Sequence, residues 1–447
     1  MLYEALVDTA SLVPGLQAQV SELNEHIKLL INGKKSDSSN TPPSHQIGRS
    51  NKKNSRKKSD RKSGGQQGHK GSTLPLSLTP DEIIMHHPLH CSCCGESLED
   101  EPSVILEKRQ EVVIPPIEAK YVEHVSSEKK CRRCGNKSRG CFPLNINAPI
   151  QYSGKLTAVV SYLSVYHHLP YKRLTVILKD LFGISLSEGT IDNMLKKVTR
   201  IAQPVYEMIQ ERIQKEKEVG SDETGAHING KQGWFFVWQS QALTFIAASM
   251  SRGYKTIFKY FPNGFPTSVY ISDCLRTQLK VPALLHQLCI AHLLRELNNF
   301  EDALSCKWST KMKTLLCDAI ELDKQFSEHD DRISNEKVRE TELKLETLLN
   351  EYDDASTHKK VQAFIVRLKK NKPSILTFLK HHYVPPDNNA SERAIRNIKI
   401  KTKVSGQFRS EDGADSFAVI RSIIDTTQKS GNNILDALVL MMLFRPE

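Results

Sequence analysis

The sequence contains no apolar stretch long enough to cross a lipid bilayer. Even the apolar segment 434–444 is too short and is interrupted by Asp436. The N-terminal residues also lack the basic segment, apolar run and small-residue cleavage site of a secretory signal. We therefore expect a soluble cytoplasmic protein. In such a reducing compartment, the ten cysteines are expected to be free or metal-bound rather than paired as disulfides.

Segment 33–72 lacks aromatic residues and holds a single Ile, so it cannot bury enough surface to fold alone. We expect a disordered linker. It carries eleven Lys or Arg and two acidic residues, which accounts for most of the net charge of +11 and favours a polyanionic partner. The alternative is a tail that only confers solubility. The residues expected to contact phosphates without base specificity are Lys52, Lys53, Arg56, Lys57, Lys58, Arg61 and Lys62.

At 447 residues the chain exceeds what one hydrophobic core supports, so several domains are expected. Segment 1–32 is expected to hold one helix. Its apolar residues recur at alternating steps of four and three, which predicts a short coiled coil for self-association. A helix docked on its own protein is the alternative. The residues of this seam are Leu16, Val20, Leu23, Ile27 and Leu30.

Two C-x-x-C pairs in segment 73–148 indicate a structural zinc site in a β-rich domain. Gly95 and Gly135, one after each pair, permit the tight turn beneath a bound metal. Apolar runs at 112–114 and 121–125 predict a β-hairpin that brings the pairs together. The four expected ligands are Cys91, Cys94, Cys131 and Cys134.

The remaining cysteines of this segment, Cys93 and Cys141, are interpreted as bystanders, although Cys93 can compete with a neighbouring ligand. A redox role for a C-x-x-C pair is the alternative to zinc. It is disfavoured because that role needs one pair and the sequence has two.

Segment 149–217 is predicted to be helical, with helices at 155–167, 171–182 and 187–200. The last two are joined by a short turn containing Gly183, and Ser187 is a suitable N-cap. This pattern is typical of a helix-turn-helix that binds DNA, and also of an ordinary helical bundle. The recognition helix would carry Thr190, Asn193, Lys196 and Lys197.

The segment from residue 218 predicts the start of an RNase H-like domain, three strands followed by a helix and a fourth strand. Asn229-Gly230 marks a hairpin turn between the first two strands. If the first and fourth strands are adjacent and parallel, Asp222 and Asp273 come side by side. The expected elements are strands at 219–226, 233–238 and 243–250, a helix at 254–261 and a strand at 268–271.

Two neighbouring carboxylates repel one another unless a cation lies between them. Mg²⁺ prefers carboxylate and phosphate oxygens, and a pair of such ions supports the breaking and joining of DNA strands. Glu392, one turn into a helix capped by one of the residues 387–389, is the best third ligand. The alternative readings are ordinary turn and helix-dipole roles, and Glu223 and Asp387 compete as ligands. Two further residues that could neutralise phosphate charge are Arg393 and Arg396.

Between Asp273 and Glu392 the sequence is almost wholly helical in pattern, with an amphipathic stretch predicted at 282–300 and a charged helical insertion at about 301–372. Cys289 and His292 share one helix face there, which fits either a metal site or core packing. Core packing is preferred because the sequence shows no second pair of ligands nearby. One turn further on, Arg295 is expected to face the active-site groove.

In their order and joint presence, these motifs resemble transposases of the insertion-sequence-sixty-six family. The match runs almost end to end. It rests on Ser36-Asp-Ser-Ser-Asn-Thr-Pro-Pro-Ser44, Gly64-Gly-Gln-Gln-Gly-His-Lys-Gly71, the double C-x-x-C, Asp222-Glu-Thr-Gly225, Ser272-Asp273, Cys289-Ile-Ala-His-Leu-Leu-Arg295 and Asp387-Asn-Asn-Ala-Ser-Glu-Arg393.

The resemblance implies that Asp222, Asp273 and Glu392 form a DDE triad that uses Mg²⁺ or Mn²⁺. It also implies that the substrates are the terminal inverted repeats of a mobile element and target DNA. A homo-oligomer on DNA and small accessory proteins are implied partners. One position departs from the family: after Asp273 the family has Gly and an aromatic residue, and this chain has Cys274-Leu275.

The sequence thus predicts a multidomain α/β protein. Its RNase H-like catalytic domain, 218–425 with the helical insertion, follows a coiled-coil helix, a basic linker, a zinc-binding domain and a helix-turn-helix-like region, and precedes a C-terminal helical segment, 426–447. A DNA-binding protein that has lost catalysis and an RNase H-like nuclease are the alternative functions.

Overall fold

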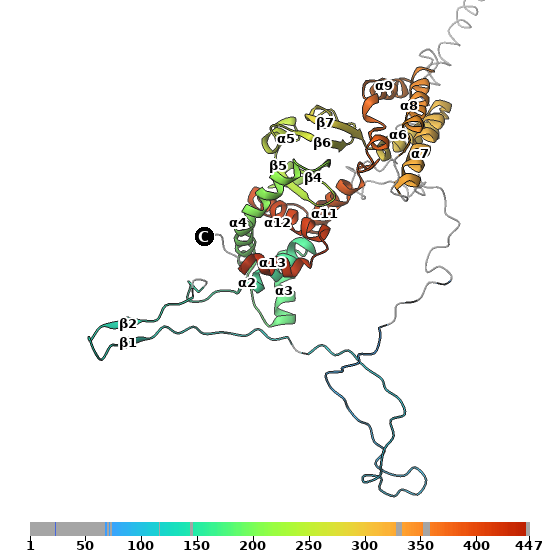
Figure 1. Ribbon diagram of the computed structural model, residues 1–447. Coiled ribbons are helices and arrows are strands. Elements are labelled where there is room, and N and C mark those ends of the chain that lie inside the picture. Colours follow the sequence, from blue (N-terminus) through green and yellow to red (C-terminus); the bar gives the residue numbers. More distant parts are fainter. Residues whose placement is uncertain are drawn as a thin grey trace, which may run out of the picture. The chain divides into compact units, whose positions relative to one another are not determined.

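The computed structural model describes residues 74–443, except 116, 144–145, 328–332 and 352–357, together with Leu23, Gly68 and Gly71 (Figure 1). The described chain falls into two units, one ending at residue 120 and one starting at residue 121. The predicted coiled-coil seam lies outside the described residues except for Leu23. The same holds for all seven basic linker residues, Lys52, Lys53, Arg56, Lys57, Lys58, Arg61 and Lys62.

The predicted hairpin strands at 112–114 and 121–125 are wrong, because neither segment is a strand in the structure. The side chains of Val112 and Tyr121, for example, are 80% and 89% exposed. Apolar residues stabilise a strand only when they pack against another surface, and these residues do not. The strands lie instead at β1 (Glu128–Lys130) and β2 (Lys137–Arg139), which pair antiparallel on either side of the second C-x-x-C motif.

The larger unit is built on a five-stranded sheet, in the order β5-β4-β3-β6-β7. β3, β4 and β5 are antiparallel, and β6 and β7 continue parallel to β3. Asn229 and Gly230 have the positive φ angles of 50° and 72° that a tight hairpin requires. The strands are β3 (Glu218–Ile228), β4 (Lys231–Gln239), β5 (Thr244–Ser249), β6 (Phe265–Ser272) and β7 (Ala283–Leu288).

The predicted order of strands, with one helical crossover, is confirmed for the first four strands. α5 (Tyr254–Tyr260) links β5 to β6, and β6 lies parallel to β3 as expected. The predicted helix at 282–300 is wrong in its first part, because β7 precedes α6 (Ile290–Leu304). β7 is stabilised by pairing with β6, at Val269–Leu285 for example, and such a distant partner leaves no local signal in the sequence.

Side chains alternate between the two faces of the sheet, so each face has its own core. Phe235 and Val237 of β4 pack into one cluster, and Phe236 and Trp238 pack into the other. The first cluster also contains residues of α2, α3 and α4, so these helices share a core with the sheet. α4 also runs on to Ile213, with Pro204 inside it, well beyond the predicted end at residue 200.

The helices that pack around the sheet, besides α5, include α2 (Gly154–Ser161), continued by a π-helical turn (Tyr162–Tyr166), α3 (Tyr171–Phe182), α4 (Glu188–Ile213), α11 (Asn389–Ser405), α12 (Glu411–Lys429) and α13 (Ile434–Leu443). α12 lies along β5, where Ile246 N donates to Ser422 Oγ at 2.9 Å. Within the described residues, no helix is both long and apolar enough to span a membrane.

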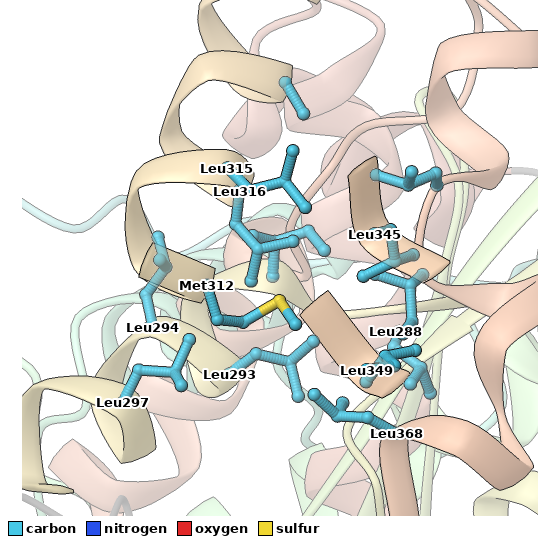
Figure 2. Close-up of a cluster of buried hydrophobic side chains, with 14 of the residues drawn as sticks. Leu288, Leu293, Leu294, Leu297, Met312, Leu315, Leu316, Leu345, Leu349 and Leu368 are labelled. Atoms are coloured by element: carbon cyan, nitrogen blue, oxygen red, sulfur yellow. The ribbon is translucent and has the colours of Figure 1, made fainter. Parts of the chain in front are cut away.

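A further set of helices stands between the second and third acidic residues of the predicted triad, and its core is continuous with Val269, Ile271 and Leu288 of the sheet. It contains α6, α7 (Lys307–Ser327), α8 (Asn335–Asn350) and α9 (Lys359–Lys370), and a short helix, α10 (Thr377–Lys380), follows. Its leucine-rich interior is shown in Figure 2, with Leu288, Leu293, Leu294, Leu297, Met312, Leu315, Leu316, Leu345, Leu349 and Leu368.

One consequence of this packing is a pH-dependent stability at His168, which has a positive φ of 60° and is 7% exposed. Burial and the neighbouring Arg421 lower the pKa of His168 to about 4. The unfolded chain takes up this proton at higher pH, so stability is lost as the pH falls from about 6.5 to 4. Asn tolerates positive φ, so we expect His168→Asn to keep the fold and flatten the stability profile between these pH values.

Urea unfolding of both proteins at pH 7.5, 6 and 5 measures this difference. His227→Asn, at an exposed position of β3, is the matched control and should retain the wild-type slope. An unchanged slope in His168→Asn would show that His168 does not carry this pH dependence.

Candidate metal centre

The register between β3 and β6 places the first two predicted acidic residues beside one another. The strands pair in parallel, with Glu218 opposite Val269 and Gly220 opposite Ile271. Continued by two residues, the same register brings Asp222 opposite Asp273. Neighbouring residues in a parallel pair project to the same face of the sheet, so the two carboxyl groups converge.

The electrostatics of Asp222 indicate that four carboxyl groups, those of Asp222, Asp273, Glu223 and Glu392, share one region. Burial, the charges of Asp273 and Glu223, and then the charge of Glu392 raise the pKa of Asp222 well above its usual value. Asp222 Oδ1 accepts the backbone N–H of Glu223 at 2.8 Å, and Asp273 Oδ1 accepts that of Leu275 at 2.9 Å. A partly buried cluster of like charges of this kind fits a binding site for a divalent cation.

Glu392 reaches this region because the N-terminus of α11 is fixed to β3. Asn388 Nδ2 donates to the carbonyl oxygen of Ser221 at 2.6 Å, and Ser391 Oγ donates to Asn388 Oδ1 at 2.6 Å. The approach needs glycine at position 220, since a Cβ there would lie 2.6 Å from Asn388 Oδ1 and 2.7 Å from Ser391 Oγ. Glu392 follows in the first turn of the helix.

The two competing carboxylates have other partners. Glu223 is buried, forms an ion pair with Arg252 at 3.1 Å and accepts a hydrogen bond from Gln278 Nε2 at 2.7 Å. Asp387 accepts the backbone N–H of Asn389 at 3.0 Å, at the start of α11. These contacts favour Asp222 over Glu223 as a ligand. Both oxygens of Asp387 are bonded to Asn389 at the helix start, whereas Glu392 is paired with Arg295, a half-exposed side chain.

Glu392 is also surrounded by the motif that opens α6. Arg295 Nη2 lies 3.1 Å from Glu392 Oε1 and 3.2 Å from Oε2, and His292 Nδ1 lies 3.6 Å from Oε1. Ligand atoms of Cys289, His292 and Glu392 all lie within 4.8 Å of one another. The sequence pattern could not show this group, because Arg295 and Glu392 are 97 residues apart in the chain.

Basic residues on α11 extend from Glu392 along one helix face. Arg396, Lys399 and Lys403 follow Glu392 at steps of four, three and four. Burial lowers the pKa of Lys399, and the charges of Asp222 and Glu392 oppose that shift, so Lys399 lies close to the acidic group. Sequence reasoning named Arg393 and Arg396, both exposed, but missed Lys399 and Lys403, although their helical spacing from Glu392 was a usable signal.

The two C-x-x-C motifs form loops of the same shape. In the first, Gly95 N donates to Cys91 O at 2.9 Å with a φ of 76° at Gly95. In the second, Gly135 N donates to Cys131 O at 2.9 Å with a φ of 75° at Gly135.

In each loop, backbone N–H groups point at the first sulfur and lower its pKa. For Cys91 they come from Cys94 and Cys93, and for Cys131 from Cys134 and Arg133. Because the loops belong to different units, the four-cysteine zinc site stays a prediction.

The predicted recognition helix is the first part of α4. Its inner face, with Ile191 and Val198, is buried in the common core, and Asn193 is exposed. Lys196 pairs with Asp192 at 2.9 Å. Of the other two predicted residues, Lys197 is half-buried, and Thr190 bonds to Ser187 and so contributes to the helix cap.

Comparison with known proteins gives one family match. The model of the family described as "Transposase IS66 family" matches residues 149–416, more than half of the chain. The matched region includes β3, β6 and the first turns of α11, and hence all three acidic residues. No match is found among curated proteins.

The docking of α11 on β3 can be tested with Gly220→Ala. The added methyl group must displace Asn388 and Ser391, which are held by buried hydrogen bonds, so we expect a loss of about 1–3 kcal/mol in the free energy of unfolding. Because Glu392 moves with the helix, stabilisation of the protein by Mn²⁺ should also fall. Thermal unfolding with EDTA and with Mn²⁺ measures both effects.

Gly189→Ala is the matched control, since a Cβ at Gly189 meets only Ser187 Oγ at 3.8 Å. It should keep wild-type stability, or gain slightly from the higher helix propensity of Ala. Wild-type behaviour of Gly220→Ala in both measurements would contradict the role given to this close approach.

Proposed function

Since this chain belongs to the IS66 family of transposases, we propose that it is a DDE transposase that cleaves the terminal inverted repeats of a mobile element and joins them to target DNA. The observation that carries the proposal is the convergence of Asp222, Asp273 and Glu392. The sheet order, with two parallel strands added beside an antiparallel meander, supports an RNase H-like catalytic domain.

The donor set fits a pair of hard divalent cations. The ligands on offer are carboxylate oxygens, which Mg²⁺ and Mn²⁺ prefer, and burial together with the charges of Asp273 and Glu223 raises the pKa of Asp222. Asp222, Asp273 and Glu392 would hold the ions. When bound, two such ions supply activation of the attacking hydroxyl and neutralisation of charge on the phosphodiester.

The basic residues near this centre would bind and orient DNA. Arg295 pairs with Glu392 and is 44% exposed at its side chain, so it can turn toward a phosphate once a cation offsets the charge of Glu392. Arg393, Arg396 and Lys399 on α11 would contact the backbone of the same strand. Further DNA contacts are proposed for Lys196 and Lys197 and for the basic linker, Lys52, Lys53, Arg56, Lys57, Lys58, Arg61 and Lys62.

The proposed reaction has two displacements at phosphorus. In the first, water attacks the phosphodiester at the element end, the bond to the 3′ oxygen breaks, and a 3′-hydroxyl and a 5′-phosphate result. In the second, that 3′-hydroxyl attacks a target phosphodiester, and the target's own 3′ oxygen leaves. Neither step needs a covalent bond between protein and DNA.

Three further features belong to the same proposal. Zn²⁺ held by Cys91, Cys94, Cys131 and Cys134 would have a structural role and fix the fold around these loops. Assembly as a homo-oligomer on DNA would bring two element ends together. Small accessory proteins encoded by the same element are further proposed partners.

The catalytic proposal is tested by strand transfer with pre-cut element ends, made from the inverted repeats that flank the gene, and Mg²⁺ or Mn²⁺. We expect joined product from the parent protein and a loss of about a thousandfold or more in Asp273→Asn, because a carboxylate ligand is removed. Asp318→Asn, at an exposed position of α7, should remain active. Equal joining by the parent and Asp273→Asn would refute the mechanism, and cleavage without joining would indicate a nuclease.

A second test needs no DNA and uses Asp222→Asn. The change removes a buried carboxyl group from a cluster of like charges, so we expect a melting temperature in EDTA that is equal to or above that of the parent. With Mn²⁺ at about a hundred times its Kd, the parent should gain about 2.7 kcal/mol, a rise of several degrees, and Asp222→Asn should gain little.

Asp180→Asn, at an exposed position of α3, is the control for this experiment and should respond to Mn²⁺ like the parent. An Asp222→Asn protein that is destabilised in EDTA and still stabilised by Mn²⁺ would show that Asp222 has a structural role and is no metal ligand.

A further inference from the structure

The side of Glu392 that faces α6 carries a set of ligands of a different chemical kind. Cys289 is the N-cap residue of α6 and is 1% exposed, and His292 lies in the first turn of the same helix. Their ligand atoms and a carboxylate oxygen of Glu392 lie within 4.8 Å of one another. Two soft or borderline ligands therefore adjoin a carboxylate that the proposed reaction uses.

The hydrogen bonding of this group leaves room for a cation. His292 Nδ1 is buried and lies 3.6 Å from Glu392 Oε1, too far for a hydrogen bond, and among the described residues it has no hydrogen-bond partner, an arrangement that is costly unless something else binds it. Cys289 Sγ accepts the backbone N–H of Asn388 at 3.2 Å. Burial raises the pKa of the Cys289 thiol to about 12, and this N–H group opposes that shift, as it would stabilise a metal-bound thiolate.

The three ligands differ from the acidic group in the ion that they select. Thiolate and imidazole together with one carboxylate suit Zn²⁺, which is commonly held by three protein ligands with a fourth position open. Mg²⁺ and Mn²⁺ prefer the all-oxygen group formed with Asp222 and Asp273. Glu392 belongs to both groups, so a Zn²⁺ ion bound on the α6 side would compete with the ions of the acidic group for its carboxylate.

We propose that Cys289, His292 and Glu392 form a Zn²⁺ site that inhibits the enzyme by withdrawing Glu392 from Asp222 and Asp273. Arg295 would have to leave Glu392 when the ion binds, and its half-exposed side chain can do so. The inhibitory part rests on the proposed transposase function. The binding part stands independently of it.

Binding is tested on the full-length protein with Co²⁺, a spectroscopic substitute for Zn²⁺ whose bond to a thiolate gives a charge-transfer absorption. We expect the parent to bind one more equivalent of Co²⁺ than Cys289→Ser, with a matching loss of absorption in the variant. Cys306→Ser, a partly buried cysteine outside the group, is the control and should keep the parental uptake. Equal uptake by the parent and Cys289→Ser would overturn the site.

His292→Gln provides a second variant in case Cys289→Ser disturbs the contact to Asn388. It should lower Co²⁺ affinity by about tenfold or more. In Mn²⁺-supported cleavage, the Zn²⁺ concentration for half inhibition should rise about tenfold or more in both variants. Zn²⁺ inhibition that is equal in the parent and both variants would overturn the inhibitory part. A parent that cleaves no DNA would refute the proposed function, and the Co²⁺ titration would still show whether Cys289 and His292 bind a metal ion.

Discussion

Three acidic side chains can occupy one partly buried region only if their mutual repulsion is offset, and this constraint organises the centre of the molecule. The carboxyl groups in and beside this region are accommodated in different ways. Burial and its acidic neighbours raise the pKa of Asp222, Arg295 pairs with Glu392, and the nearby Glu223 is neutralised by Arg252. The fold thus holds the carboxyl groups close together, and a pair of divalent cations, with four positive charges, would offset their mutual repulsion.

The fold supplies the three carboxyl groups from elements whose positions are fixed independently. β3 and β6 are held by sheet register, and α11 is held by Asn388 and by the absence of a side chain at Gly220. The helical insertion, with its leucine-rich core, positions the first turn of α6 against the other side of Glu392. Glu392 consequently lies between an all-oxygen group and a sulfur–nitrogen group, and under the proposed competition the ion that binds it would decide which group it completes.

Much of this could be predicted from sequence where the signal is local. The Asn229-Gly230 turn and the strand-forming residues of β4 define the meander, and a single crossover helix then makes β6 parallel to β3. For this reason the sequence alone predicted that Asp222 and Asp273 lie beside one another. β7 was missed because its partner β6 stabilises it from elsewhere in the chain, and its apolar residues also fit a helix.

The part of the site that sequence could not predict depends on contacts between distant residues. The two strands predicted near 112 and 121 are wrong although their local β propensity is strong, because no other described part of the structure covers their side chains, which are exposed. The group of Cys289, His292 and Glu392 could not be predicted from sequence, because Glu392 joins the other two residues only when α11 docks beside α6.

The departure at Cys274-Leu275 shows how tertiary contacts can maintain a local turn. The glycine that the family resemblance implies at position 274 would ease a sharp bend after β6, and in this chain the bend is closed by Asp273 itself, whose Oδ1 accepts the N–H of Leu275. Cys274 packs against the core of the helical insertion, and burial raises its pKa to about 12, as expected for a thiol among apolar side chains. The insertion therefore anchors the turn through the substituted residue, and one carboxylate oxygen of Asp273 remains for a cation because a single backbone bond occupies the other.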